Sequence, residues 1–324
     1  MEADILAPHF TDSDKAREFL ESKRWPDGPV CPRCGVIGEA YRLQADVENK
    51  NTKTHGRKGL YKCGSCREQF TVTVGTVMAD SHIPLNKWLL AFHLMAASKK
   101  GMSAHQMHRQ LDITYKTAWF MCHRIREAMT ETNRPKLGGA GKVVEADETF
   151  FGRKPGEFKR RAGFAHKNAI VALVERDGGV RALHVPNMGK ASIQAVVDAS
   201  AHKASHLMTD EAMHYRKLGK EFSAHSAVKH SAGEYVRKNA HTNTIEGFFS
   251  ILKRGLIGTY HHVGPQHLQR YVSEFDFRYN NRKVTELNEQ GEQVTRPMTD
   301  GERALIALSG VTGKRLTYRR TQNN

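Results

Sequence analysis

The amino-acid sequence predicts an α+β protein of several domains, and three patterns along its 324 residues indicate this class. Two Cys-x-x-Cys pairs indicate a small metal-bound module near the N-terminus. Apolar residues at helical spacing follow over residues 84–129, and short strand-like runs dominate after Val143. At roughly 100–200 residues per domain, this length suggests two or three domains. We expect domains over residues 1–80, 81–135 and 140–285 and a C-terminal extension over residues 286–324.

The chain is strongly basic, because 50 Lys and Arg residues stand against 34 Asp and Glu residues and leave a formal net charge of +16. Lysine and arginine side chains that neutralise phosphates release condensed counterions, so an excess of this size favours a polyanionic partner. Some soluble proteins are basic without such a partner, and charge does not distinguish DNA from RNA. The chain opens on the acidic stretch Met1–Asp4 and has no long apolar run, so we expect neither a secreted nor a membrane protein.

Four of the five cysteines form the two pairs, which are Cys31 with Cys34 and Cys63 with Cys66. Two Cys-x-x-Cys turns can each direct two thiolates to one tetrahedral zinc ion, and Gly35 and Gly64 permit the tight backbone turns. Two disulfides are the alternative, but a cytosolic chain disfavours them, and a redox motif explains only one pair. We therefore expect a zinc ribbon with a structural zinc ion. After the second pair, residues 69–74 alternate in polarity and predict a strand.

Residues 84–129 predict a segment that is similar in outline to a helix-turn-helix. A first helix is expected over residues 85–98, and a short helix over residues 103–111 is joined by a tight turn to a second over residues 116–129. The last helix carries basic residues that favour a DNA reader over the alternative, a generic helical linker: His123, Arg124 and Arg126. The fifth cysteine, Cys122, lies in the same helix, where we expect it to pack rather than to react.

The residues after Val143 predict a sheet with helices. An apolar run over residues 169–174, a turn at Asp177-Gly178-Gly179 and a second run over residues 180–185 predict a hairpin. Further strands end at Asp147 and at Asp210, and the last helix carries Glu246. The order strand, strand, strand, helix, strand, strand, helix is that of the ribonuclease-H-like α/β fold.

Three carboxylates are the candidate catalytic residues, namely Asp147 and Asp210 at strand ends and Glu246 on the last helix. In the ribonuclease-H-like arrangement these positions converge at one edge of the sheet, where their charges repel unless divalent cations compensate. Carboxylate oxygens suit magnesium or manganese, and two such ions can activate water or a 3′-hydroxyl for displacement at phosphorus. Other acids nearby keep the choice of triad open. They are Glu145, which shares the strand face of Asp147, Glu148 and Glu211.

Four stretches of this C-terminal half resemble motifs of the bacterial insertion-sequence DDE transposases. Residues 144–152 resemble the motif of the first acid, residues 209–215 that of the second, and residues 241–254 that of the third. Residues 271–282 are similar to the C-terminal signature of the same family. The branch that the chain resembles is the ISXO-like one, which also carries an N-terminal zinc ribbon.

The resemblance implies that Asp147, Asp210 and Glu246 are catalytic and hold two magnesium ions, or manganese. It also implies that Lys253, two helical turns after Glu246 and on the same face, holds transposon-end DNA. Arg254 is a further candidate for a DNA contact, and Asn243 is expected to contact DNA or the wall of the active site. The chain would be a DNA transposase that binds the terminal inverted repeats of its element and catalyses magnesium-dependent phosphodiester hydrolysis and strand transfer.

The implied partners are element and target DNA and further copies of the chain in a synaptic complex, in the cytoplasm at the nucleoid. Two alternatives stay open: a zinc-ribbon DNA-binding regulator with an inactive ribonuclease-H-like domain, and a stand-alone nuclease of the same fold. Lys229 and the basic run Lys159-Arg160-Arg161 are further candidate phosphate contacts. The tail after about Lys283 departs from compact patterning, and we expect it to be loosely held.

Overall fold

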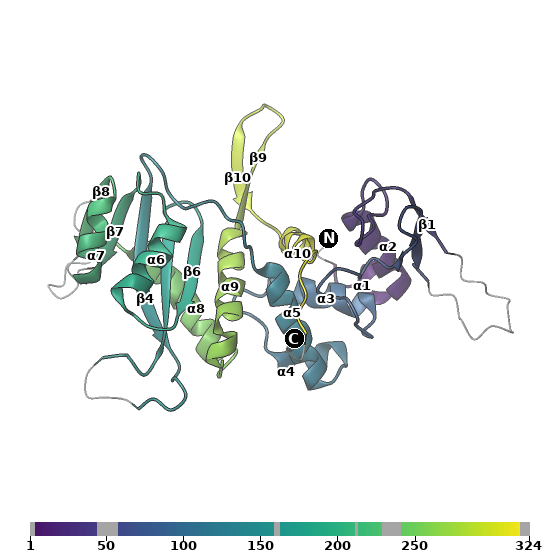
Figure 1. Cartoon of the computed structure of the whole chain (residues 1–324), viewed down its shortest axis with the longest axis horizontal. Helices are drawn as coiled ribbons and strands as arrows, with labels where there is room; N and C mark the ends of the chain where they lie inside the picture. The colour runs from purple at the N-terminus through teal and green to yellow at the C-terminus, as the bar shows by residue number, and fades with distance from the viewer. Residues whose placement is uncertain (1–3, 44–57, 159–162, 211–212, 229–240, 318–324) are drawn as a thin grey trace. The chain divides into compact units, whose positions relative to one another are not determined.

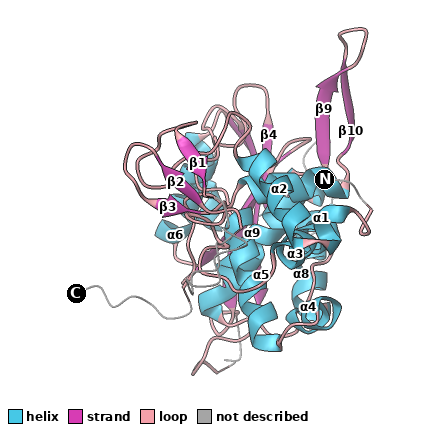
Figure 2. Cartoon of the chain, turned by 90° about the vertical axis from the view of Figure 1, so that its right-hand side faces the viewer, coloured by secondary structure: helices cyan, strands magenta, loops and turns pink. Residues whose placement is uncertain are grey.

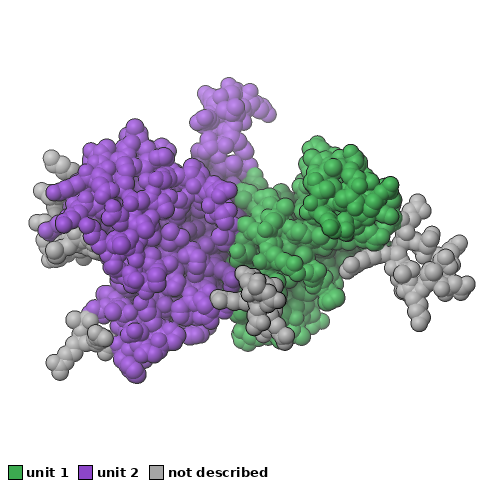
Figure 3. Space-filling model, viewed as in Figure 1, with its two compact units in different colours: residues 1–97, 104–128, 299–324 green, residues 98–103, 129–298 purple. Residues whose placement is uncertain are grey.

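The protein is described here by a computed structural model, which covers residues 4–43, 58–158, 163–210, 213–228 and 241–317. The chain divides into two compact units (Figure 3). The first comprises residues 1–97, 104–128 and 299–324, and the second comprises residues 98–103 and 129–298. The C-terminal residues therefore return to the unit in which the chain begins. The four domain boundaries expected from the sequence stay a prediction.

The first unit begins with two helices and a small antiparallel sheet (Figure 2). The elements are α1 (Pro8–Thr11), α2 (Ser13–Arg24), β1 (Ala40–Arg42), β2 (Tyr61–Cys63) and β3 (Gln69–Phe70). Asp12 caps α2, because its Oδ1 accepts hydrogen bonds from the backbone N–H groups of Asp14 and Lys15, each at 2.8 Å. The buried rings of Trp25, Tyr61 and Phe70 form the core, with centroids 5.4 to 5.9 Å apart. So small a core needs a further source of stability.

The strand predicted over residues 69–74 is wrong beyond Phe70, where β3 ends. The backbone after it is occupied by turns instead of a ladder: the N–H of Val74 donates to Thr71 O, and the N–H of Thr76 donates to Thr73 O. The carbonyl of Val72 accepts from the guanidinium of Arg24. Threonine hydroxyls support the turns, since Thr76 Oγ1 also donates to Thr73 O at 2.6 Å.

The helices predicted over residues 84–129 are present as α3 (Leu85–Ala97), α4 (Ala104–Leu111) and α5 (Tyr115–Met129). Asp112, at φ 47°, makes the turn between α4 and α5. The expectation that basic residues of α5 form a DNA-binding surface is wrong for His123 and Arg126, because both are buried. Arg124 is half-buried, and its guanidinium donates to Ala79 O at 3.0 Å. Exposed side chains lie instead at the start of α5, at Tyr115 and Lys116.

The C-terminal tail is more ordered than its composition predicts. Residues 300–309 form α10 (Asp300–Ser309), which packs on α3. A capping box starts the helix, because Thr299 Oγ1 accepts from the N–H of Glu302 while the Glu302 carboxylate accepts from the N–H of Thr299. Ala304 and Leu308 are buried on its inner face. The sparse apolar residues of the tail thus fall at helical spacing and suffice to dock one helix.

The second unit is built on a five-stranded mixed sheet in the order β6-β5-β4-β7-β8 (Figure 1). Its strands are β4 (Val143–Phe151), β5 (Asn168–Glu175), β6 (Val180–Val185), β7 (His206–Asp210) and β8 (Ala224–Val228). The strands β4, β5 and β6 are antiparallel, whereas β7 and β8 run parallel to β4. Asp177, at φ 60°, makes the predicted β5–β6 turn. The α/β domain that the sequence predicts is confirmed, and the structure shows that its sheet is mixed.

Helices cover both faces of this sheet because its strands alternate two sets of apolar residues. Those of one face, including Val144, Ala146 and Leu173, pack with α6 (Lys190–Ser200) and α7 (Met213–Leu218), which continues into a 3-10 turn (Gly219–Glu221). Those of the other face, including Ile170 and Ala172, pack with α8 (Asn243–Gly258) and α9 (Pro265–Asn280). The even-numbered residues of β4 thus face α6 and α7, and the odd-numbered ones face α8.

Helix α9 seals the open edge of strand β6 with polar side chains. Asn280 bonds twice to Val180, accepting from its N–H at 2.7 Å and donating to its carbonyl at 3.0 Å. Asp276 accepts from the N–H of Ala182 at 2.9 Å, and Gln269 accepts from the N–H of His184 at 2.7 Å. The backbone groups of an unpaired edge strand are thereby satisfied at every second residue. The hydrogen bonds of α9 to β6 thus give residues 271–282 a structural role that their sequence motif does not predict.

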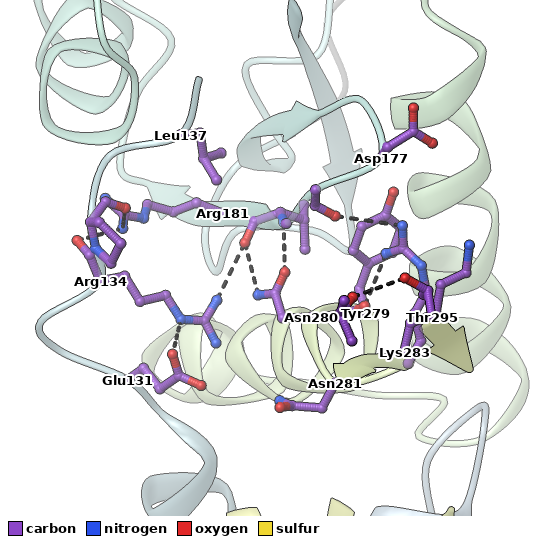
Figure 4. A pocket seen from close by; sticks show the side chains of 16 residues that line it. Glu131, Arg134, Leu137, Asp177, Arg181, Tyr279, Asn280, Asn281, Lys283 and Thr295 are labelled. Carbon is purple, nitrogen blue, oxygen red and sulfur yellow. Dashed lines mark hydrogen bonds and ion pairs between the residues drawn. The ribbon is translucent and has the colours of Figure 1, made fainter. Parts of the chain in front are cut away.

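A pocket of about 660 Å³ lies beside Asn280, where several arginines meet (Figure 4). Their guanidinium groups donate to protein carbonyls: Arg134 to Val180 O, and Arg181 to the carbonyls of Arg134 and Pro135. Arg282 lies over the ring of Tyr279, 3.6 Å from its centroid. Arg134 and Arg181 therefore hold strand β6 against the segment that precedes β4, and none of the three candidate acids lines this pocket.

A hairpin of β9 (Lys283–Leu287) and β10 (Gln293–Pro297) follows α9, and Glu286 pairs with Arg296 across it at 2.8 Å. Leu287 and Val294 are exposed on the hairpin. Among the residues that the structure covers, no helix combines the length and apolar character needed to cross a membrane.

Replacing Asn280 by alanine should lower the free energy of unfolding by about 2 kcal/mol, because it leaves the N–H of Val180 without its partner and removes one of the two donors to the Val180 carbonyl, the other being Arg134. Urea denaturation of the two proteins measures the difference. Asn281→Ala is the matched control, since Asn281 donates only to Phe277 O within its own helix. An equal loss in both variants would contradict the edge-sealing role.

Burial raises the pKa of Asp276 to about 7, although the N–H of Ala182 and the guanidinium groups of Arg134 and Arg181 oppose the shift. The folded state therefore holds a proton that the unfolded chain releases near pH 4, so this residue makes stability fall as pH rises from about 4 to about 7. Asp276→Asn should flatten that fall and be the more stable protein above pH 7. Thermal unfolding across this pH range tests it, and parallel curves for the two proteins would contradict it.

Candidate functional site

The pairing of β4 with β7 puts two of the predicted acids side by side. The parallel register aligns Val143 with His206 and Glu145 with Met208. Two residues further along both strands stand Asp147 and Asp210, which therefore fall at the same level and on the same face of the sheet. Neighbouring strands lie about 4.8 Å apart, so the two carboxyl groups come from adjacent backbones.

Helix α8 brings the third acid to the same face. It packs on β4 and β5, and Glu246 lies in its first turn. The N-cap residue Thr242 is buried, and its hydroxyl donates to Glu246 Oε1 at 3.0 Å. Residues Asn243, Glu246, Lys253 and Arg254 are all exposed on this helix. The predicted spacing of seven residues thus leaves Glu246 and Lys253 on one open face of α8.

The electrostatics of Asp147 show that the three acids interact. Burial raises the pKa of Asp147, the N–H of Glu148, which donates to its Oδ1 at 2.7 Å, lowers it, and the charges of Glu148, Asp210 and Glu246 raise it; together they bring the pKa to about 7. A carboxyl group in this setting binds a proton readily, or gives it up to a cation. Glu148, Asp210 and Glu246 are therefore electrostatic neighbours of Asp147.

The three carboxylates do not meet at one point, however. Within the described parts of the chain, the cysteine cluster is the one group of three or more ligand atoms close enough to hold a single ion. In a two-ion centre, pairs of carboxylates can each serve one ion about 4 Å from the other, which does not require all three at one point.

The structure separates two of the alternative acids from this group. Glu148 lies on the opposite face of β4, where the buried Tyr215 donates its hydroxyl to Glu148 Oε2 at 2.9 Å. Burial, and then the charge of Glu148, raises the pKa of Tyr215 well above its usual value, so the hydroxyl stays a donor. Glu145 is fully buried beneath the start of α8 and makes four hydrogen bonds there. Glu211 lies outside the described residues.

The candidate DNA contacts are only partly described. Lys253 is exposed, and the exposed Arg254 donates from Nε to Ser250 O and from Nη2 to Ser250 Oγ, both at 3.1 Å. Asn243 is the first residue of α8. The run Lys159–Arg161 and Lys229 lie outside the described residues. Sequence reasoning missed the exposed start of α5, since a helical pattern gives the buried side but not which polar residues reach a partner.

The four paired cysteines form a separate metal-binding group in the first unit. Their sulfur atoms all lie within 4.8 Å of one another, with Cys31 Sγ 3.6 Å from Cys66 Sγ and Cys34 Sγ 3.6 Å from Cys63 Sγ. A tetrahedral zinc ion with Zn–S bonds of 2.3 Å would require about 3.8 Å between sulfurs. The cluster is therefore of the size that one zinc ion needs.

The two cysteine turns have the same backbone conformation and the same hydrogen bond. Gly35, at φ 78°, and Arg67, at φ 64°, both follow the second cysteine of a pair in the left-handed region. Each donates its N–H to the carbonyl of the first cysteine, Gly35 to Cys31 at 3.0 Å and Arg67 to Cys63 at 3.1 Å. The role predicted for Gly64 is wrong. It permits close approach instead, because a Cβ there would lie 2.8 Å from Glu39 O.

The thiols need a cation to be ionised together. Burial raises the pKa of Cys31, but backbone N–H groups of Cys34 and Arg33 outweigh it and hold the value at about 7. At Cys66 the N–H of Glu68 lowers the pKa, yet burial and the other three sulfurs raise it to about 12. Ionising a second thiol beside the first is thus energetically unfavourable. A divalent ion would reverse this, because its charge stabilises the thiolates.

Comparison with known proteins gives matches over both parts of the chain. Residues 136–280 match the family described as ISXO2-like transposase domain, and residues 11–69 match the transposase zinc-ribbon domain. The chain is 25% identical over 285 residues to an uncharacterized protein in transposable element ISH50 of Halobacterium salinarum, covering 83% of this chain and 91% of that protein.

A solved structure of the large terminase nuclease from thermophilic phage G20c with bound magnesium is 10% identical and covers 59% of this chain and 96% of that one. Its TM-score of 0.20 is too low to carry an argument.

Removing one cysteine of the cluster should release the metal and unfold its module. Cys63→Ser is expected to lose the zinc, about one ion per chain in the unchanged protein, because three thiolates leave the tetrahedron open. Elemental analysis gives the zinc content, and hydrogen exchange over residues 11–69 reports the loss of structure. Cys122→Ser is the control, since Cys122 is buried in α5 and outside the cluster. Full zinc content in Cys63→Ser would refute the assignment.

Proposed function

The chain belongs to the ISXO2-like insertion-sequence transposases by both of its matched domains, and from this we propose that it cuts DNA at the ends of its own element and joins them to a target. The observation that carries the proposal is the β4–β7 register, which puts Asp147 beside Asp210 on the face that also receives Glu246 from α8. The cysteine module and the net charge of +16 support DNA as the partner.

We assign Asp147, Asp210 and Glu246 to hold the divalent ions, magnesium or manganese. When bound, such ions would supply an activated water or 3′-hydroxyl and stabilise the leaving oxygen at phosphorus. Asp147 would exchange its proton for a cation, since its pKa near 7 marks a carboxyl group whose negative charge is poorly compensated without one. Lys253 and Arg254, exposed on the same helix as Glu246, would contact the phosphates beside the cut.

The first unit supplies end recognition in this proposal. The zinc ribbon and the pair α4–α5 would bind the terminal inverted repeats. At the start of α5, the exposed Tyr115 and Lys116 occupy the helix end that enters the major groove in helix-turn-helix proteins. His105 supports this surface by stacking on Tyr115, with ring centroids 4.3 Å apart. Joining both ends of an element to one target would require at least two copies of the chain in a complex.

Conservative changes of the three acids should abolish cleavage and leave DNA binding intact. Asp147→Asn, Asp210→Asn and Glu246→Gln are each expected to lower the rate about a thousandfold or more, because metal stabilisation of a phosphoryl transition state is worth several kcal/mol. The assay is magnesium-dependent nicking of duplexes that carry the repeats flanking the gene, with binding measured by gel shift.

Asp177→Asn is the matched control, since Asp177 is an exposed acid of the same unit in the β5–β6 turn. If the unchanged protein binds these ends but never nicks them, it is a DNA-binding regulator. If it cuts any duplex without preference for the repeats, it is a stand-alone nuclease. Either result would overturn the proposed function.

A further inference from the structure

We infer that Glu145 is a positioning residue of the active site: its buried carboxylate anchors the first turn of α8 and so sets the place of Glu246 relative to Asp147. This inference rests on the proposed function. It differs from a metal-binding or purely structural role for Glu145, and each of those alternatives predicts a different result below.

The carboxylate of Glu145 is fully buried and accepts four hydrogen bonds. Its Oε2 accepts from the backbone N–H groups of Thr244 and Ile245, each at 3.0 Å. Its Oε1 accepts from Thr244 Oγ1 at 2.9 Å and from Arg176 Nε at 2.7 Å. Three of these donors belong to the first turn of α8, so one side chain of the central strand holds the start of that helix.

The count of donors decides against Glu145 as a metal ligand. An ionised carboxylate offers about four lone-pair directions, and four donors occupy Glu145. A further contact comes from His241, whose Nδ1 lies 3.5 Å from Oε1. A cation would have to displace one of these bonds, whereas Asp147 receives one backbone N–H, from Glu148. The two acids share a strand face but have different surroundings.

The start of a helix lowers the cost of burying this charge. The first N–H groups of a helix have no partners within it, and the positive end of the helix dipole favours a carboxylate there. Arg176 compensates the charge further, and its Nη2 donates to His241 O at 2.8 Å in the segment that enters α8. The backbone N–H of Arg176 donates to Val143 O at 3.0 Å, which ties the same residue to β4.

The anchor acts next to the catalytic positions on both elements. Glu145 is two residues from Asp147 on one face of β4, and Ile245 directly precedes Glu246 on α8. A shift of α8 along β4 would break the hydrogen bond from Ile245 to Glu145 and would move Glu246 at the same time. Displacements of about 1 Å are enough to cost large factors in catalysis, so this hydrogen bond fixes a distance that the reaction depends on.

The test compares Glu145→Gln with Glu175→Gln. Glu175 is a matched control because its carboxylate also accepts from a backbone N–H, that of Gly138 at 2.8 Å, and from a cation, Lys142 Nζ at 2.7 Å, but nothing in α8. We would measure Mn²⁺ binding by electron paramagnetic resonance and hydrogen exchange at the Thr244 and Ile245 amides. Both readouts are independent of cleavage.

Glu145→Gln should weaken Mn²⁺ binding about tenfold, the factor that 1.4 kcal/mol represents, and speed exchange at the two amides, while Glu175→Gln leaves both unchanged. Unchanged Mn²⁺ affinity in Glu145→Gln would overturn the inference in favour of a structural role. Complete loss of binding, as in Asp147→Asn, would overturn it in favour of direct ligation.

Failure of the proposed function gives a different result. If the unchanged protein bound no Mn²⁺, the proposed function would be refuted, and so would the inference that Glu145 places Glu246 for metal binding. Amide exchange would still decide whether Glu145 anchors α8. If Glu145→Gln does not fold, Thr244→Val serves instead, because it removes one of the four hydrogen bonds and keeps the carboxylate. The Mn²⁺ affinity of this variant should then fall by about twofold to threefold. An unchanged affinity would show that Glu145 has no positioning role.

Discussion

Like charges repel, and the carboxyl groups of Asp147, Asp210 and Glu246 are neighbours only because bonds elsewhere hold their backbones in place. Burial and then the charges of neighbouring acids raise the pKa of Asp147 to about 7. Helix α8, which carries Glu246, stays on the sheet through its buried apolar residues and through the hydrogen bonds to Glu145 at its start. The second unit therefore holds the three acids close to one another through restraints on the backbones that carry them.

Strand β4 supplies most of these restraints. Its parallel pairing with β7 fixes Asp210. Glu145, on one face of the strand, holds the first turn of α8, and Glu148, on the other face, accepts from Tyr215 of α7, the helix that follows Asp210. Two carboxylates close to Asp147 on the same strand thus bind the two elements that carry Asp210 and Glu246 or follow them. Helix α9 adds a third restraint from a distance, since Asn280, Asp276 and Gln269 close the far edge of the same sheet.

The sequence predicted what depends on local pattern. The cysteine spacing indicated the metal cluster, alternation and apolar runs predicted the strands of the mixed sheet, and the motifs indicated the transposase family. It could not predict what depends on partners far along the chain. The donors to Glu145 lie near residues 176 and 244, and the carbonyls that occupy the arginines beside β6 come from several segments, so a rival catalytic acid and a structural anchor look alike in one dimension.

The sequence also could not predict which polar residues of a helix are buried. His123 and Arg126 fit the pattern of a basic reading helix, yet both are buried in α5. The tail beyond residue 283 has the opposite character, since a few apolar residues at helical spacing are enough to dock α10 on α3. The role of each acid in the triad stays a prediction. An anomalous difference map from crystals grown with manganese tests it most directly: peaks between Asp147, Asp210 and Glu246 are predicted, and a well-ordered site without such peaks would contradict the account.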